Sequence, residues 1–103
     1  MQGFQLTFYT AQNRHHEQRP MHDWLLDEAR KLGIKGATII PASQGYGHDG
    51  VLHAAHFFEL ADQPVLVVMI VQASEADQLF AVLAQHALSL FYVKTPVEFG
   101  TTG

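Results

Sequence analysis

The first part of the chain alternates between strongly apolar and less apolar side chains. Residues 4–9 read FQLTFY, in which Phe4, Leu6 and Phe8 occupy every second position. This is the two-residue period of a β-strand with one buried face. The polar stretch AQNRHHEQR, residues 11–19, has no such period and predicts a loop after the strand.

Two later segments carry hydrophobic residues at helical spacing. The first begins at Pro20, which suits the first position of a helix, and ends at Gly33. The second follows Ser74, whose spacing to Asp77 resembles an N-cap signal. The apolar stripes that define the two helices are Met21, Trp24, Leu25, Ala29 and Leu32, then Ala76, Leu79, Phe80, Leu83 and Ala87.

Three further strands complete the pattern. They are predicted in ATIIPAS (37–43), in VLVVMIV (65–71) and in LSLFYVKTPVEF (88–99), and Pro41 indicates that the first of them lies at a sheet edge or a bulge. The resulting order is β-α-β-β-α-β. It predicts an α+β protein with the ferredoxin-like fold, in which two helices cover one face of a four-stranded antiparallel sheet. We expect residues 1–103 to form a single domain.

Two of these strands are apolar on both faces. In residues 65–71 every position is hydrophobic, and residues 90–93 place Leu90 and Tyr92 on one side and Phe91 and Val93 on the other. Two helices can cover only one face of the sheet. A second apolar face exceeds the patch that a soluble monomer normally exposes, so we predict that other copies of the chain cover it. The alternative is that the loops at residues 11–19 and 45–56 fold back over it.

Composition excludes several classes of function. Six Lys and Arg residues are scattered among ten Asp and Glu residues, which argues against a nucleic-acid partner. Cysteine is absent, so disulfides and thiolate metal sites are excluded. The N-terminus has no signal-peptide pattern, and the longest apolar run is far shorter than a membrane span. These features predict a soluble, cytoplasmic protein.

The segment GYGHDGVLHAAH, residues 45–56, concentrates the candidate chemistry. Its glycines at Gly45, Gly47 and Gly50 permit positive φ angles and the close approach of an anion to backbone amides, with Tyr46 between them. Because no helix follows, the segment is not a dinucleotide fingerprint. Two interpretations remain open, namely contact with a ligand in a subunit cleft and a bulged strand end beside a hairpin arm.

The histidines of the same segment offer a second chemistry. His48, His53 and His56 could bind a divalent metal such as Zn²⁺, Cu²⁺ or Ni²⁺ through their imidazoles, with Asp49 adding a carboxylate. Exposed loop histidines without a ligand are the alternative. Acid–base catalysis by Glu59 and Asp62 beside His53 and His56 is a third interpretation, but no nucleophile motif supports it, and we predict that the protein is not an enzyme.

The chain has few cations that could meet a phosphate. Arg14 and Arg19 flank His15 and His16 in the predicted loop, which could close over a cleft and supply positive charge, or else remain solvated. Lys35 lies near a strand end. We group these three cations with the glycine segment and His53 as candidate ligand-binding residues.

An ordered series of motifs resembles one known family. GATII from Gly36, GYGHDGVLH from Gly45 and LADQPV from Leu60 are similar to the PII-like family called domain of unknown function number one hundred and ninety. The resemblance implies a homotrimer with a mobile arm at residues 42–58, an adenine nucleotide or other small effector in clefts between subunits, and regulation of a membrane transporter or enzyme. The alternative is a metal-binding trimer that uses the loop histidines.

The junction between the second helix and the last strand departs from PII proteins proper. Those proteins hold phosphate there with a glycine-rich, basic loop, whereas this chain reads AQHALS at residues 84–89. The segment contains neither glycine nor a basic lysine or arginine.

Overall fold

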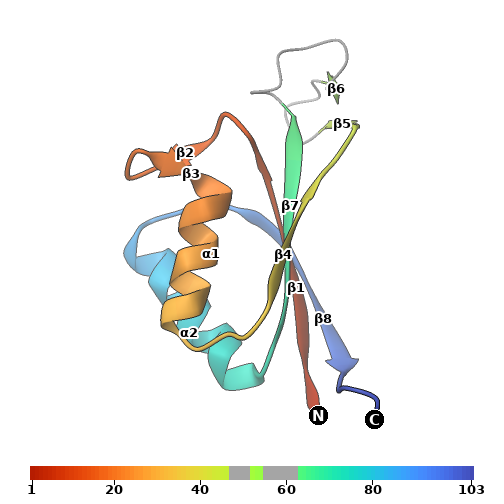
Figure 1. Ribbon diagram of the computed structural model, residues 1–103. Coiled ribbons are helices and arrows are strands. Elements are labelled where there is room, and N and C mark those ends of the chain that lie inside the picture. The colour runs from red at the N-terminus through yellow and green to blue at the C-terminus, as the bar shows by residue number, and fades with distance from the viewer. Residues whose placement is uncertain (47–51, 55–62) are drawn as a thin grey trace.

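The computed structural model describes residues 1–46, 52–54 and 63–103. Its centre is a four-stranded antiparallel sheet in the order β4-β7-β1-β8, with both helices on one face (Figure 1). The bounds of these elements are β1 Gln2–Ala11, α1 Met21–Lys31, β4 Ala37–Pro41, β7 Pro64–Val71, α2 Ala73–Gln85 and β8 Phe91–Glu98. The ferredoxin-like arrangement predicted from the sequence is confirmed, and β4 is an edge strand as Pro41 indicated.

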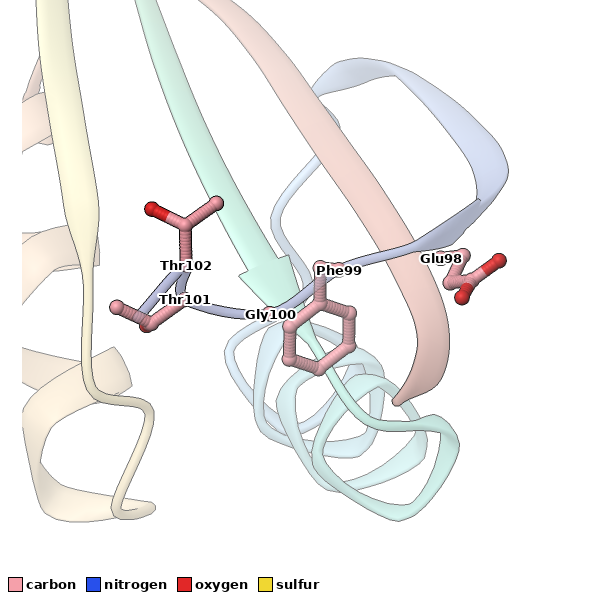
Figure 2. A pocket seen from close by; sticks show the side chains of 5 residues that line it. All are labelled: Glu98, Phe99, Gly100, Thr101 and Thr102. Atoms are coloured by element: carbon pink, nitrogen blue, oxygen red, sulfur yellow. The ribbon is translucent and has the colours of Figure 1, made fainter.

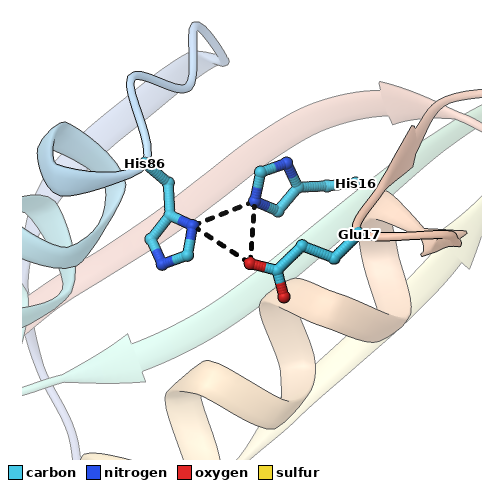
Figure 3. A group of neighbouring side chains, drawn as sticks. All are labelled: His16, Glu17 and His86. Atoms are coloured by element: carbon cyan, nitrogen blue, oxygen red, sulfur yellow. Dashed lines mark hydrogen bonds and ion pairs between the residues drawn. The ribbon is translucent and has the colours of Figure 1, made fainter.

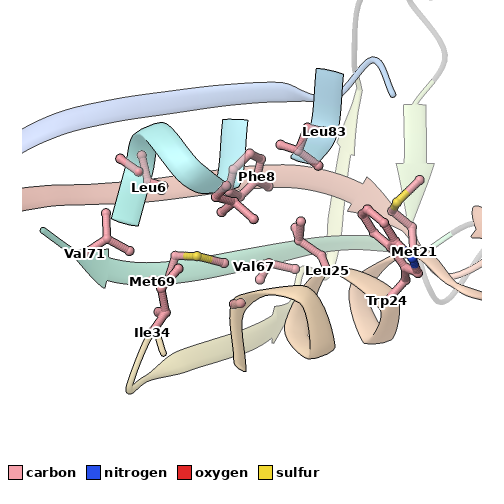
Figure 4. Close-up of a cluster of buried hydrophobic side chains, with 13 residues drawn as sticks. Leu6, Phe8, Met21, Trp24, Leu25, Ile34, Val67, Met69, Val71 and Leu83 are labelled. Carbon is pink, nitrogen blue, oxygen red and sulfur yellow. The ribbon is translucent and has the colours of Figure 1, made fainter. Parts of the chain in front are cut away.

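The hydrophobic core lies between the sheet and the two helices (Figure 4). Alternate residues of β1 and β7 point into it, because successive side chains of a strand face opposite sides. Trp24 of α1 is 2% exposed and closes the core at one end, which confirms it as a core residue. The buried residues are Leu6, Phe8, Met21, Trp24, Leu25, Ala29, Ile34, Val67, Met69, Val71, Ala76, Leu79 and Leu83.

Both helices begin differently from the sequence prediction. Pro20 is the N-cap of α1, outside the helix, because it pairs in a short strand just before it. The N-cap of α2 is Gln72, not Ser74. The Gln72 N–H donates to the Glu75 carboxylate over 2.7 Å, and the Gln72 side chain bonds in return to the backbone of the first turn. This capping box starts the helix two residues before the weaker signal at Ser74.

The two helices end in the same hydrogen-bonded motif. In α1 the N–H of Gly33 bonds to the Arg30 carbonyl, and Ile34 reaches back to Ala29. In α2 the N–H of Ala87 bonds to the Ala84 carbonyl, and Leu88 bonds to Leu83. These are the paired bonds of a Schellman motif, which needs a left-handed residue after the C-cap. The φ angles are 82° at Gly33 and 53° at Ala87, so Ala87 lies outside α2, not within its stripe.

The segment predicted as a loop after β1 contains a small hairpin. His15–His16 (β2) and Arg19–Pro20 (β3) pair as two-residue strands. The two residues between them, Glu17 and Gln18, have φ angles of 53° and 65°. Positive φ at both central positions is the requirement of a type I′ turn, which matches the twist of a tight hairpin. The polar composition concealed these strands because neither has an apolar face.

The sheet face away from the helices is exposed and rich in apolar side chains. Phe91 is 69% exposed, while Tyr9, Ile40, Ile70 and Val93 are each between 37% and 43% exposed. The rings of Tyr9 and Phe91 meet edge to face, with their centroids 5.5 Å apart. On the opposite side of β8, Tyr92 packs toward the helices, 4.8 Å from the Phe80 ring. The prediction that both faces of the sheet are apolar is confirmed by these residues.

The chain termini lie together at one end of the sheet (Figure 1). The Met1 ammonium donates to the Phe99 carbonyl and the Phe99 N–H donates to the Met1 carbonyl, each over 2.8 Å. A Cβ on Gly3 would stand 2.2 Å from the Val71 carbonyl oxygen and 2.8 Å from the Phe99 ring. This position therefore requires glycine. Among the described residues, no helix has the length and hydropathy to cross a bilayer.

Candidate functional site

The opposite end of the sheet brings together three connecting segments. There β1 ends at Ala11, opposite the first residue of β7, and β8 begins beside Tyr9. A short hairpin of β5 (Gln44–Tyr46) and β6 (Leu52–Ala54) also rises from this end (Figure 1). The β5–β6 hairpin, the loop with β2 and β3, and the junction between α2 and β8 thus share one end of the molecule.

Main-chain and side-chain hydrogen bonds hold the root of the β5–β6 hairpin. The Ala42 N–H donates to the Pro64 carbonyl over 2.9 Å, and the Gln63 amide donates to the Ala42 carbonyl over 3.2 Å. The Gln12 N–H in turn donates to the Gln63 carbonyl over 3.0 Å. The root of the hairpin is therefore connected directly to the loop that follows β1.

The structure places part of the predicted glycine and histidine segment. Gly45 pairs with His53 and Tyr46 pairs with Leu52 along the β5–β6 hairpin, so Gly45, Tyr46 and His53 share one short stem. The other predicted members, Gly47, His48, Gly50 and His56, lie outside the described residues. The anion nest and the arm metal site therefore stay predictions.

Two of the three predicted cations lie at the end of the sheet from which the β5–β6 hairpin extends. The Arg14 guanidinium donates to the Ser89 carbonyl and so ties the loop after β1 to the junction after α2. Arg19 pairs with Asp27 of α1 at 2.5 Å, and both side chains are partly exposed. Lys35 precedes β4 and is exposed at the other end of that strand. Within one chain, therefore, the structure does not bring Lys35 to those other predicted site residues that it describes.

A cluster of two imidazoles and one carboxylate occupies the same end of the molecule (Figure 3). His16 and Glu17 come from the β2–β3 hairpin, and His86 is the C-cap of α2. The distance from His16 Nε2 to His86 Nδ1 is 3.0 Å, and Glu17 Oε1 lies 3.7 Å from the first nitrogen and 3.4 Å from the second. These side chains from separate elements converge on one point.

The indole of Trp24 packs against both imidazoles. Its ring centroid is 4.7 Å from that of His16 and 4.9 Å from that of His86, and both contacts are edge to face. Because Trp24 is fixed in the core, it limits the orientations that the two rings can adopt.

Sequence reasoning missed this cluster for a physical reason. His16 and His86 are 70 residues apart in the sequence. They meet only because α2 ends at the position that places His86 beside the β2–β3 hairpin. Glu17 reaches them only because its backbone adopts a left-handed angle in the turn. The one available signal was local, an adjacent histidine and glutamate in a polar stretch close to the helix that carries Trp24.

Two hollows of the described surface lie at the terminal end of the sheet and beside α2. One, of about 410 Å³, is lined by five consecutive residues, Glu98, Phe99, Gly100, Thr101 and Thr102, at the terminal end of the sheet (Figure 2). The other, of about 190 Å³, is lined mainly by aliphatic and aromatic side chains. Its lining residues are Phe8, Phe80, Leu83, Ala84, Leu88, Leu90 and Tyr92. Neither hollow contains a predicted site residue.

Comparisons with known proteins show the fold and the family of the chain. The ferredoxin-like sheet resembles that of solved PII-like structures, and this likeness confirms the fold. The chain belongs to the DUF190 family, described as Uncharacterized ACR, whose model matches residues 3–99. The resemblance deduced from the sequence motifs therefore led to the correct family.

One relative and two solved structures of a second protein illustrate the similarity. A UPF0166 protein of Aquifex aeolicus is 29% identical over 75 residues, which cover 73% of this chain and 71% of the relative. CPII of Thiomonas intermedia K12, a nitrogen regulatory PII-like protein bound to ADP, AMP and bicarbonate, superposes with a TM-score of 0.73 at 18% identity, covering 98% of this chain and 91% of that one. CPII bound to ADP and bicarbonate gives a TM-score of 0.66 at 18% identity, with the same coverage.

Proposed function

We infer that this protein is a non-enzymatic, PII-like regulator that binds a small anionic ligand, with an adenine nucleotide as the leading candidate. The whole chain acts as one domain, and three copies form a homotrimer with ligand clefts between subunits. Ligand binding changes the arm at residues 42–58, which in turn acts on a transporter or an enzyme. One observation carries the proposal: the arm root and the loop that bears both Arg14 and Arg19 converge at one end of a sheet whose outer face is apolar and exposed.

The exposed face supports association of the chain with itself. Five large side chains, Tyr9, Ile40, Ile70, Phe91 and Val93, lie on this face across all four strands and are at least 37% exposed. Fully burying an exposed aromatic or aliphatic side chain contributes about 1.5–3 kcal/mol. These five residues are 37–69% exposed, so covering each of them contributes a part of that amount and favours an oligomer. A second copy presents the same apolar face and is the simplest complementary surface.

The cations at the hairpin end support an anionic ligand. Arg19 reaches only Asp27 among the described residues, and a partly exposed ion pair of this kind contributes little to stability. A phosphate can replace the carboxylate and accept two parallel hydrogen bonds from the guanidinium. Arg14 directly precedes β2 of this hairpin, and its backbone supports the start of α1, because the Arg14 carbonyl accepts the Met21 N–H over 2.8 Å. In solved CPII structures the bound molecules include ADP and AMP, which is consistent with this ligand class.

Isothermal titration calorimetry with ADP and AMP tests the ligand. We expect submillimolar binding, and we expect Arg19→Gln to weaken it about tenfold, as loss of a charge-assisted hydrogen bond does. The matched control is Lys31→Gln, which removes a lysine whose 3.3 Å ion pair with Glu28 lies on α1. Absence of binding for both nucleotides, or equal weakening in the two variants, would contradict the proposed nucleotide site.

Sedimentation velocity tests the assembly separately. At micromolar concentration we expect a trimer of the 11.5 kDa chain. A monomer under these conditions would refute the inter-subunit cleft, whatever the calorimetry shows.

A further inference from the structure

We propose that His16, Glu17 and His86 bind one divalent transition-metal ion, with Zn²⁺ as the ion of choice. The three ligand atoms form a triangle with sides of 3.0, 3.4 and 3.7 Å (Figure 3). Zn²⁺ binds imidazole nitrogen and carboxylate oxygen at about 2.0–2.2 Å, so two ligands of a tetrahedral ion are about 3.3–3.5 Å apart. The observed triangle is therefore close to one face of a coordination tetrahedron.

The donor set selects the class of ion. Two imidazoles and one carboxylate suit Zn²⁺ and its neighbours Co²⁺, Ni²⁺ and Cu²⁺, whereas Ca²⁺ and Mg²⁺ prefer oxygen ligands throughout. Glu17 is 58% exposed, while His16 is 20% and His86 is 31% exposed. The fourth position of the ion would thus face the surface, where water or a ligand can occupy it.

The two imidazoles are already placed for such an ion. Trp24 contacts both rings, so little side-chain freedom remains to be lost on binding. Without the ion, His16 Nε2 and His86 Nδ1 share one hydrogen bond. When the ion binds, the donor imidazole moves its proton to its other ring nitrogen, and both lone pairs then point to the metal.

Left-handed φ angles in residues other than glycine occur around the cluster. Among the described residues, the non-glycine residues with positive φ are Glu17, Gln18 and Ala87, with φ angles of 53°, 65° and 53°. Each is a member of the cluster or adjacent to one. Left-handed backbone in residues other than glycine is unfavourable and gathers at functional sites. The turn that carries this penalty is the one that turns the Glu17 carboxylate toward the histidines.

This metal site is distinct from the arm histidines and does not depend on the proposed function. His48, His53 and His56 belong to the arm segment, while the three ligands here come from the β2–β3 hairpin and the end of α2. Loss of nucleotide binding would leave the metal proposal intact, and the reverse also holds.

Calorimetry with ZnCl₂ tests the proposal on the full chain, prepared without a polyhistidine tag and freed of metal by a chelator. We expect about one ion per chain, and at least a hundredfold weaker binding in His86→Ala and in His16→Ala. His15→Ala is the matched control, because His15 is exposed and its Nδ1 bonds instead to the Asn13 carbonyl over 3.0 Å. This variant should bind as the wild type does.

The variants Glu17→Gly and Ala87→Gly distinguish the loss of a metal ligand from the effect of placing glycine at a left-handed position. Both replace a left-handed residue by glycine, so both should stay folded, but only the first removes a ligand. We expect Glu17→Gly to weaken Zn²⁺ binding at least tenfold and Ala87→Gly to leave it unchanged. Equal affinity in these two variants would overturn the assignment of Glu17.

Tryptophan fluorescence supplies a second readout, since Trp24 is the only tryptophan of the chain. Cu²⁺ bound at this cluster should quench its emission, and the quenching should disappear in His86→Ala but persist when His48, His53 and His56 are all replaced by alanine. No Zn²⁺ binding, or binding lost only in the triple arm variant, would overturn the proposal. The second of these results would establish the arm as the metal site instead.

Discussion

The ends of the two helices allow two opposite substitutions to be predicted, alanine to glycine after α2 and glycine to alanine after α1. Both helices close with the same Schellman hydrogen bonds, but α1 uses Gly33 at the left-handed position and α2 uses Ala87. A Cβ on Gly33 would meet nothing within 4 Å, so side-chain packing does not complicate that position. We expect Ala87→Gly to raise the free energy of unfolding and Gly33→Ala to lower it.

The magnitude follows from two opposing terms. Left-handed backbone costs an L-residue about 1–2 kcal/mol, which glycine avoids. Glycine also increases the entropy of the unfolded chain, which reduces the gain by about 0.4–1 kcal/mol. The net effect is about 0.5–1 kcal/mol for each substitution, with opposite signs. For a chain of this size it corresponds to about 2–8 °C in the melting temperature.

Urea and thermal unfolding followed by circular dichroism measure both variants. Because an oligomer makes the melting temperature depend on concentration, all variants are compared at one chain concentration. An Ala87→Gly variant that unfolds at or below the wild-type urea midpoint would refute the argument. So would a Gly33→Ala variant that matches the wild type.

Three further changes test other parts of the structure. Gly3→Ala should destabilise by about 1–3 kcal/mol in urea unfolding, since its Cβ would overlap backbone, while Gly36→Ala, with open space around it, should not. Ile70→Asp on the exposed sheet face should shift sedimentation from trimer to monomer, whereas Gln78→Asp on the exposed side of α2 should leave the trimer intact. Glu75→Ala should cost about 0.5–2 kcal/mol by opening the capping box; an unchanged urea midpoint would contradict that role.

The architecture was predictable because it depends on periodic burial. The alternation at Phe4, Leu6 and Phe8 and the continuous apolar run at 65–71 are each long enough to fix a strand and its faces. The helix starts were less predictable, since Gln72 is a rare cap and its role depends on a reciprocal bond with Glu75. Periodicity contains no information about such local hydrogen bonds.

The candidate sites also differ in how far the sequence alone predicts them. The arm was recognised because its glycines and histidines are adjacent in sequence, and its stem is confirmed by the pairing of Gly45 with His53. The cluster of His16, Glu17 and His86 depends on tertiary register, and the adjacency of His16 and Glu17 does not indicate that His86 joins them. The sequence assigned Arg14 and Arg19 to one polar loop, but their contacts to Ser89 and Asp27 follow only from the folded structure.

The choice of residues at the left-handed positions bears on function as well as stability. At the end of α1 the chain uses Gly33, which removes the backbone penalty. Around the histidine cluster it uses Glu17, Gln18 and Ala87 instead, and each of them retains that penalty. For Glu17 a side-chain requirement explains the choice, because glycine would remove the carboxylate 3.4 Å from His86 Nδ1. The methyl group of Ala87 cannot bind a metal. Glu17→Gly should therefore change both the free energy of unfolding and the Zn²⁺ affinity, whereas Ala87→Gly should change only the free energy of unfolding.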